Sequence, residues 1–345
     1  MDQEIWQQLL SLESRDVTQQ WFFKIHGRKL NVRRAKEINA AAKQSREYFR
    51  NASNSDYSVR PLLTYYGVAS LSRALLLLLR KEGGEECLTS GHGLTTIDWG
   101  RLLSGDTSLG LTSLLNLKLQ TCSGLFSDLV KGTNNQISIH VSSSAVDWKV
   151  NYPVPDDGNQ VSLGDLFSRI PDLLIDYSNI SSDIKYSRVS EMSYSEQNGF
   201  KVNVLTRNFE YFKDTYKDMG YKIDNQGQWS TLTCDASTFG QNLPLFVHSY
   251  VQKTFGTIPT LFIADPFSSK FAYSQLCITF LSAYFLGMLA RYFPTHWISL
   301  IQGEKGDVLW PTINRAQQFV ENSYPELVVE MIYEMMKENV KKPIN

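Results

Sequence analysis

The segment PLLTYYGVASLSRALLLLLRKEGG, from Pro61 to Gly84, decides the predicted fold because it is apolar on nearly every side of a helix. Proline suits the first turn of a helix, and a glycine pair is typical of the end of one. A helix that is hydrophobic all round is buried on all sides. We therefore expect this segment at the centre of a helical bundle, with the other helices packed around it.

The segment before it, residues 31–52, has the pattern of an amphipathic helix. Apolar residues follow one side at helical spacing, and basic residues keep to a stripe on the opposite side. The candidate nucleic-acid contacts of this basic stripe are Arg33, Lys36, Lys43, Arg46 and Arg50. Aligned cations can neutralise phosphates and make binding sensitive to salt. A solvated helix face without a ligand has the same pattern, so both interpretations stay open.

After Lys131 the pattern changes to the alternation of apolar and polar residues that is typical of strands. A helix over residues 208–220 interrupts the strands, with Asn208 as its cap and Gly220 at its end. The alternating runs are residues 136–141, 145–150, 200–205 and 228–234.

Helical spacing returns near Pro266. An apolar helix is expected up to Phe293, and two further helices should begin at Pro311 and Pro325. Together these patterns predict an α+β, mainly helical fold in which both ends of the chain build one bundle. The predicted parts are an N-terminal helical part over residues 1–132, a central strand-rich insertion over residues 133–264 and a C-terminal helical part over residues 265–345.

The composition is that of an ordinary globular protein. The chain of 345 residues has 34 basic and 35 acidic residues, so net charge predicts neither a nucleic-acid nor an acidic partner. The four cysteines lie far apart, which argues against a disulfide framework and a cysteine zinc site. Motifs of P-loop hydrolases, dehydrogenases, zinc proteases and serine hydrolases are absent from the sequence. The N-terminus lacks the features of a signal peptide. We expect a cytoplasmic protein without a metal or other cofactor.

Two apolar segments raise the question of a membrane span. Residues 62–79 contain Arg73 in their interior, and an unpaired arginine is costly at the centre of a bilayer. Residues 276–290 number only fifteen, fewer than a helix needs to cross. We interpret both as core helices of a protein without membrane contact, and we expect Arg73 to bind a buried acid or a carbonyl.

The segment LARYFPTHW, residues 289–297, places Arg291 and His296 with four residues between them. Histidine exchanges protons near neutral pH and arginine binds phosphate oxygens, so the pair suits RNA cleavage without a metal. Pro294 biases Phe293 away from helical geometry, so the two side chains need not share a face. In the structural alternative, Arg291 pairs with a carboxylate and His296 lies in the first turn of the next helix.

A second histidine of interest is His92 in SGHGL, residues 90–94. The flanking glycines leave its side chain accessible, which suits a catalytic residue. The other interpretation is a connection between two helices in which the imidazole hydrogen-bonds backbone groups.

Several segments together resemble the YaaC-like family of bacterial proteins, whose function is largely unassigned. The segments are SREYFRNA, RPLLTYYGVASLSRALLLL, SGHGL and LSAYFLGMLARYFPTHW. The most specific piece is Arg-Tyr-x-Pro-x-x-Trp at Arg291, Tyr292, Pro294 and Trp297. The resemblance covers both helical parts of the chain, and the middle is less recognisable.

An alanine-rich helix, a Tyr-Tyr helix and a loop with His-Gly-Leu are also similar to the opening of HEPN domains. These are small helical bundles common in toxins and antiviral systems, and many carry an Arg-x4-6-His motif that converges on RNA in a dimer. The resemblance implies that Arg291 stabilises phosphate charge and that His296 assists proton transfer at the ribose 2′-hydroxyl, without a metal. It also implies an HEPN-like bundle and a homodimer.

The sequence leaves two functions open. We expect a cytoplasmic interaction or regulatory subunit that engages RNA through the basic stripe, in a bacterial defence or toxin-type system. Its partners are expected to be RNA, another protein or a second copy of the chain. The alternative is a metal-independent HEPN-type endoribonuclease with Arg291 and His296 as catalytic residues, which rests on one spacing.

Overall fold

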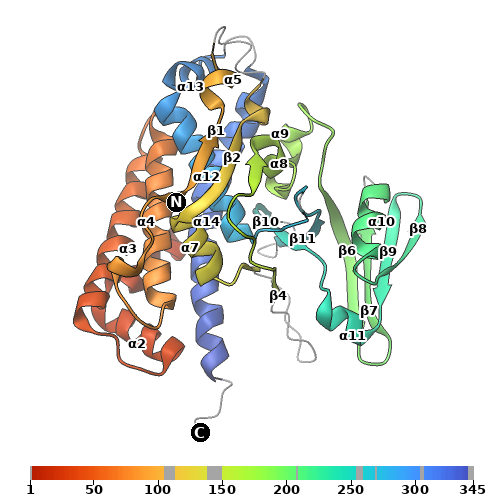
Figure 1. Ribbon diagram of the computed structural model, residues 1–345, viewed down its shortest axis with the longest axis horizontal. Coiled ribbons are helices and arrows are strands. Elements are labelled where there is room, and N and C mark those ends of the chain that lie inside the picture. The colour runs from red at the N-terminus through yellow and green to blue at the C-terminus, as the bar shows by residue number, and fades with distance from the viewer. Residues whose placement is uncertain are drawn as a thin grey trace.

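The computed structural model describes residues 2–104, 113–137, 150–206, 209–253, 259–268, 270–303 and 307–340. Residues 138–149, which hold most of two predicted strands, and the predicted helix cap Asn208 lie outside these ranges. The fold is α+β and mainly helical, as predicted, with the strand-rich region in the middle of the chain (Figure 1).

The helical bundle combines both ends of the chain. Its helix α4 (Arg60–Leu79) lies at the centre and buries residues on nearly every side (Figure 1). It packs against α3 (Val32–Ser53), α12 (Gln275–Tyr292) and α14 (Trp310–Val340). The bundle helices are α1 (Gln3–Leu9), α2 (Arg15–His26), α3 (Val32–Ser53), α4 (Arg60–Leu79), α12 (Gln275–Tyr292), α13 (Pro294–Ile301) and α14 (Trp310–Val340).

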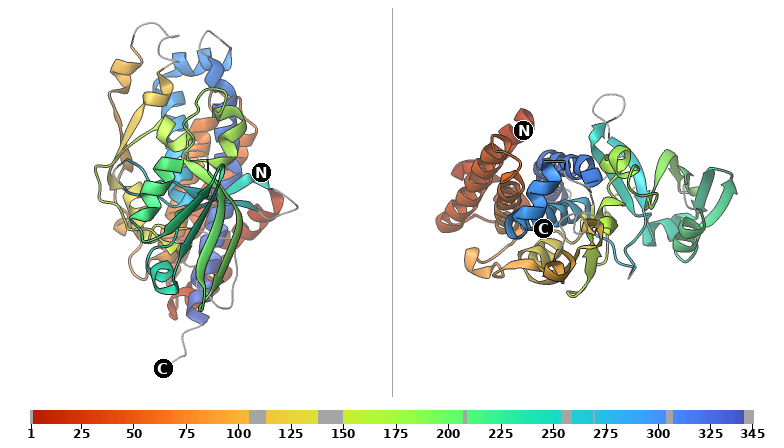
Figure 2. Two further views of the ribbon diagram at one scale, coloured as in Figure 1. Left: turned by 90° about the vertical axis from the view of Figure 1, so that its right-hand side faces the viewer. Right: turned by 90° about the horizontal axis from the view of Figure 1, so that it is seen from above.

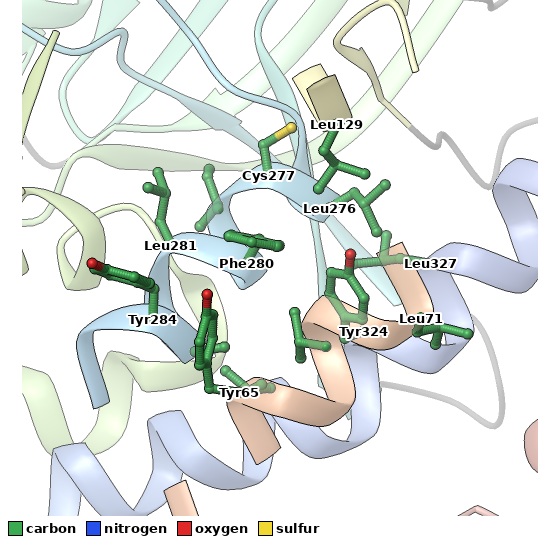
Figure 3. Packing of buried hydrophobic residues seen from close by; sticks show 14 of the residues in the cluster. Tyr65, Leu71, Leu129, Leu276, Cys277, Phe280, Leu281, Tyr284, Tyr324 and Leu327 are labelled. Carbon is green, nitrogen blue, oxygen red and sulfur yellow. The ribbon is translucent and has the colours of Figure 1, made fainter. Parts of the chain in front are cut away.

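The contact between α4 and α12 joins the two ends of the chain. The ring of Tyr65 meets the rings of Phe280 and Tyr284 edge to face, with centroids 6.1 and 5.3 Å away. In the same core, the hydroxyls of Ser72 in α4 and Tyr324 in α14 lie 2.5 Å apart. Figure 3 shows these tyrosines and Phe280 in one buried cluster. The prediction that the first and last thirds of the chain share one core is therefore confirmed.

A partly buried polar network also connects α4 to α14. The Arg60 guanidinium donates two hydrogen bonds to the Glu321 carboxylate, and the Nε–Oε1 distance is 2.7 Å. The Thr64 hydroxyl donates to the same carboxylate, and the Gln317 amide donates to both Thr64 and Glu321. Charges removed from water need such partners, so the network fixes how these two helices align.

Helix α14 runs without a break from Trp310 to Val340, so the prediction that a new helix begins at Pro325 is wrong. A proline inside a helix removes one hydrogen bond and costs about 3 kcal/mol. Its neighbours Tyr324 and Leu327 are buried in the core, and burying one such side chain stabilises by about 1.5–3 kcal/mol. Tertiary packing therefore outweighs the proline.

A three-stranded antiparallel sheet lies beside the bundle. It has the order β1 (His92–Ile97), β2 (Lys118–Gly124) and β5 (Gln160–Ser162), and α7 (Leu125–Gly132) packs between β1, β2 and α4. Residues 90–94 are therefore not a connection between two helices, because β1 begins at His92. The strand was missed because its partner β2 follows a long connection, and the apolar alternation within HGLTTI is short.

The strand-rich insertion contains a six-stranded antiparallel sheet with its own buried cluster. The predicted strands over residues 200–205 and 228–234 are confirmed, and α10 (Phe209–Lys217) lies within the predicted helix. Strand β10 packs against α14, whereas the outer strands stand apart from the bundle (Figure 2). The order is β10 (Phe246–Lys253), β11 (Pro259–Ala264), β6 (Tyr186–Ser195), β7 (Gly199–Leu205), β9 (Trp229–Cys234) and β8 (Lys222–Gln226).

Short elements lie between the main helices and strands, and one of them ties the smaller elements to the larger sheet. Buried Asp172 in one of them accepts hydrogen bonds from the backbone N–H groups of Tyr250 and Val251 in β10, at 3.0 and 2.8 Å. This carboxylate ties the connection to the edge of the larger sheet. The short elements are η1 (Leu10–Glu13), η2 (Glu85–Cys87), α5 (Trp99–Leu102), η3 (Leu114–Asn116), β3 (Gln136–Ile137), β4 (Val150–Asn151), α8 (Leu163–Phe167), η4 (Pro171–Leu173), α9 (Leu174–Tyr177), α11 (Ala236–Gln241) and η5 (Asp307–Leu309).

Helix α4 is long and apolar enough to cross a membrane, and α12 with α13 passes the same test only as a pair bent by 105°. Of the apolar window of α4, 67% is buried inside the protein, as in the core helix of a bundle. Arg73 is exposed, so the expectation that it binds a buried acid or carbonyl is wrong. Arg73 lies on the side of α4 that is least covered, together with the half-buried Tyr66 and Ala69.

Candidate functional site

The basic stripe lies on the solvent side of α3, where the helical spacing places it. Lys36 and Lys43 are exposed, and neither forms an ion pair with a carboxylate in the described part of the chain. They are seven residues apart, which is two helical turns, so both point to the same side of the helix. Among the described residues, these two lysines are the cations of the stripe without a carboxylate partner.

The three arginines of the stripe are held in ion pairs. Carboxylates from α3 itself, from η1 and from η2 therefore offset their charge, which weakens the stripe as a phosphate-binding surface. The spacing within α3 could not reveal the partners from η1 and η2, because these belong to other segments. The pairs are Arg33 with Glu37 and Glu86, Arg46 with Glu13 and Glu47, and Arg50 with Glu47.

A sharp turn separates Arg291 from His296. Arg291 lies in the last turn of α12, and His296 lies in the first turn of α13, as the structural alternative predicted. Phe293 between them has φ −129° and ψ 54°, and the two helices are bent by 105°. This is the effect expected of Pro294 on the residue before it.

The two side chains also have different environments. His296 is 8% exposed, and its Nε2 atom is buried without a hydrogen-bond partner among the described residues. Burial lowers the pKa of this imidazole. Arg291 is exposed. The structure therefore does not bring these two residues together at one accessible surface.

Arg291 instead lies among tyrosines. Its Nη1 donates to the Tyr66 hydroxyl at 2.9 Å, and its guanidinium lies over the ring of Tyr292, 4.9 Å from the centroid. The carboxylate partner expected for this arginine is not found in the part of the chain that the structure describes, where its contacts are with tyrosines. Burial and then the positive charge of Arg291 lower the pKa of His92, so these two residues lie within electrostatic range.

Two glycines set the backbone conformation around His92, the first residue of β1. The pairing of β1 with β2 shifts register between His92 and Leu94. Gly93 has φ +78°, and a Cβ atom there would lie 2.7 Å from the backbone nitrogen of Phe126. Gly124 on the facing strand has φ +149°, and its Cβ would lie 2.3 Å from the Gly93 nitrogen. Only glycine fits both positions, so this irregularity is set by the sequence.

The imidazole of His92 packs against buried tyrosines. Its Nδ1 lies 2.5 Å from the Tyr65 hydroxyl, and its ring centroid lies 5.8 Å from that of Tyr284. The Tyr284 hydroxyl donates to the Leu94 carbonyl at 3.1 Å, which ties α12 to β1. Burial raises the pKa of Tyr65 far above its usual value and that of Tyr284 to about 12. Both hydroxyls therefore stay protonated at neutral pH.

We define the Tyr-His-Arg cluster as Tyr65, Tyr66, His92, Tyr284 and Arg291. Its members come from α4, β1 and α12, so the cluster exists only because both ends of the chain share one core. It combines a permanent positive charge with an imidazole whose lowered pKa keeps it neutral at pH 7. Sequence reasoning singled out the histidine and the arginine separately, and only the packing of the helices joins them.

Asp265, a carboxylic acid with a shifted pKa, lies at the junction of the bundle and the insertion. Burial raises the pKa of Asp265 to about 6, although Arg169 and Lys185 favour the charged form. The Arg169 guanidinium donates to the backbone carbonyls of Asp265 and Pro266, which indicates a structural junction. Within the described ranges, no three His, Cys, Asp or Glu side chains are grouped so that they could hold a metal ion.

A comparison with protein families found a match that covers the Tyr-His-Arg cluster. A family model described as YaaC-like Protein matches residues 10–332, which contain every member of the Tyr-His-Arg cluster. The chain belongs to the YaaC-like family. No match was found among curated proteins or among solved structures. In this YaaC-like protein, the match spans the bundle helices from α2 to α13, most of α14 and the strand-rich insertion.

Proposed function

We propose that this YaaC-like protein is a cytoplasmic interaction protein that engages single-stranded RNA at the Tyr-His-Arg cluster. The observation that carries the proposal is the exposure of Arg291 and its contacts with tyrosines. Its guanidinium is exposed, and it contacts tyrosines rather than a carboxylate among the described residues. A guanidinium binds phosphate oxygens with a planar pair of donors, so an arginine in this state suits a phosphate ligand.

Tyrosines near Arg291 offer surfaces for bases. Tyr292 is 59% exposed. Tyr48 and Tyr66 are half-buried, and their rings form a tilted pair with centroids 5.6 Å apart. Single-stranded RNA is bound chiefly by stacking unpaired bases on aromatic rings and by contacts to phosphates. A cation among accessible tyrosines supports this class of ligand.

The basic stripe of α3 supports the proposal less strongly. Lys36 and Lys43 are free to contact backbone phosphates. The arginines of the stripe would first have to leave their carboxylates, which reduces the gain from binding. We therefore expect the Tyr-His-Arg cluster to contribute more affinity than the stripe.

The resemblance to HEPN domains supports a proposal for the type of bundle and the kind of system in which the protein acts. It supports an HEPN-like bundle in a bacterial defence or toxin-type system, with a protein partner or a second copy of the chain. The endoribonuclease alternative requires Arg291 and His296 to meet at the RNA, and the burial of His296 disfavours it. RNA cleavage is therefore an outcome that a binding experiment should monitor.

Fluorescence anisotropy with a labelled single-stranded RNA oligonucleotide tests the proposal. We expect Arg291→Ala to weaken binding about tenfold or more, because a hydrogen bond to a charged group contributes about 1.5–3 kcal/mol. The matched control is Arg188→Ala, which removes another exposed arginine from β6 in the larger sheet. This control should leave the affinity unchanged.

Two results would overturn the proposal. One is a wild-type protein that does not bind the RNA, and the other is an equal loss of affinity in both arginine variants, which would indicate unspecific charge attraction. Gel electrophoresis of the same samples monitors the RNA. Cleavage that disappears in both Arg291→Ala and His296→Ala would support the endoribonuclease instead.

A further inference from the structure

We propose that His92 and Arg291 together form a binding site for a terminal phosphate group, in which the Nε2–H group of His92 and the guanidinium of Arg291 both donate to phosphate oxygens. The inference rests on the proposed function for the identity of the larger ligand, an RNA strand. The phosphate site itself depends on the geometry of His92, Tyr65 and Arg291.

The contact with Tyr65 decides which nitrogen of His92 carries the proton. The Tyr65 side chain is fully buried, and within the described ranges its hydroxyl has Nδ1 of His92 as its hydrogen-bond partner. If Nδ1 donated this bond, the hydroxyl proton would be buried without an acceptor, which is unfavourable. The hydroxyl therefore donates to Nδ1, and the neutral ring carries its proton on Nε2.

The donor that results is available to a ligand. The two nitrogens of an imidazole point in widely different directions, so the Nε2–H group is directed away from Tyr65. His92 is partly exposed, and no group in the part of the chain that the structure describes accepts a hydrogen bond from Nε2. The cluster thus offers an N–H donor that the protein itself does not use.

Arg291 supplies the second donor and the charge. Its Nη1 is occupied by Tyr66, and the other N–H groups of the guanidinium remain for a ligand. The Tyr66 ring lies 5.6 Å from the ring of Tyr65, which contacts His92, so both donors border the same pair of tyrosines. The effect of the Arg291 charge on the pKa of His92 agrees with this placement.

A terminal phosphate suits this arrangement better than a phosphodiester within a strand. His92 is half-buried beside Tyr65 and Tyr284, which are 0% and 5% exposed, whereas Arg291 is exposed to solvent. A phosphodiester carries a sugar on each side, and both would have to approach the half-buried imidazole. A phosphomonoester enters end-on, has three free oxygens and carries about −1.5 to −2 charge at neutral pH.

The tautomer of His92 is a direct test that does not depend on RNA. Long-range proton–nitrogen NMR spectra of the whole protein, labelled with nitrogen-15, should show the wild-type ring protonated on Nε2. Tyr65→Phe removes the hydroxyl and keeps the ring, so we expect a mixture of tautomers in this variant. A wild-type ring protonated on Nδ1 would overturn the assignment of the donor.

Binding measurements then compare RNA oligonucleotides of one sequence that end in a 5′-phosphate, a 3′-phosphate or only hydroxyls. We expect one phosphorylated end to raise the affinity about tenfold, as one charge-assisted hydrogen bond can do. His92→Asn removes the donor at the Nε2 position and should abolish this preference. His92→Gln is the matched variant, because its amide reaches that position and should retain part of the preference.

Inorganic phosphate and a nucleoside monophosphate serve as small probes of the same site. Equal binding of all three RNAs would overturn the inference and leave the proposed RNA binding intact. Binding of the small probes that depends on His92, without any RNA binding, would support the phosphate site and overturn the proposed function. A preference for phosphorylated ends that His92→Asn leaves unchanged would place the phosphate elsewhere.

Discussion

His296 is a residue whose burial has a measurable consequence for stability. Its Nε2 is buried without a partner among the described residues, and burial lowers its pKa. The unfolded chain takes up a proton on histidine near pH 6.5, as an ordinary imidazole does. The folded state binds that proton less readily, so stability falls as the pH drops through about 6.5 toward the lower folded pKa. We expect His296→Leu to lose less stability than the wild type between about pH 7 and pH 5, measured by urea denaturation.

An identical pH dependence in His296→Leu and the wild type would show that the folded protein accommodates the charged ring. His26 and His92 also have lowered pKa values because of burial, so the variant should reduce the acid sensitivity without removing it.

At the same scale, sequence predicted the position of His296 but not the contacts of Arg291. The effect of Pro294 is local, so the first-turn position of His296 in the next helix could be derived from the segment alone. The partner of Arg291 is Tyr66 in α4, 225 residues earlier in the chain. The partner of His92 is Tyr65, which also lies in α4. Such contacts depend on how α4 packs against α12, and this packing cannot be read from the spacing of residues in the sequence.

Between elements, the close packing of α4 on α12 depends on Gly287. A Cβ atom at this position would lie 2.8 Å from the Tyr65 Cβ and 3.3 Å from the Pro61 carbonyl oxygen. These atoms sit at or next to the backbone and cannot rotate away, so the helices would have to separate. We expect Gly287→Ala to lower the free energy of unfolding by about 1–3 kcal/mol in urea denaturation, the usual cost of overpacking.

The matched control for this prediction is Gly100→Ala in α5. No atom lies within 4 Å of a Cβ added at Gly100, so its stability should not fall. A Gly287→Ala protein as stable as the wild type would contradict the close approach of the two helices.

The helices of this chain could be predicted more completely than its strands. The apolar residues of α4 and α12 reveal buried helices, because the hydrogen bonds of a helix form within one segment. Strand β1 needs β2 as its partner, and the continuity of α14 through Pro325 depends on burial of the neighbouring side chains. Both depend on contacts between segments.

For the whole molecule, the decisive feature is that one hydrophobic core contains residues from both ends of the chain, whereas the outer strands of the larger sheet have a core of their own. Strongly apolar helices at both ends predicted the shared core, because neither can bury its surface alone. The Tyr-His-Arg cluster could not be predicted in the same way, since it lies where the bundle meets a small sheet that the sequence pattern did not reveal.

The shared core predicts that both ends of the chain unfold together. Glu321→Ala leaves the partly buried Arg60 without its carboxylate and removes an acceptor of Thr64 and Gln317. We expect the free energy of unfolding to fall by about 1–3 kcal/mol, since a buried group that loses its charged partner is costly. Hydrogen exchange measured by mass spectrometry should show lower protection in α4, α12 and α14 together, and unchanged protection in β7 and β9. Glu210→Ala, which removes an exposed carboxylate from α10, is the control and should change neither region. Lower protection confined to α14 would mean that the C-terminal helices unfold without the N-terminal ones, and the single core would then not be one cooperative unit.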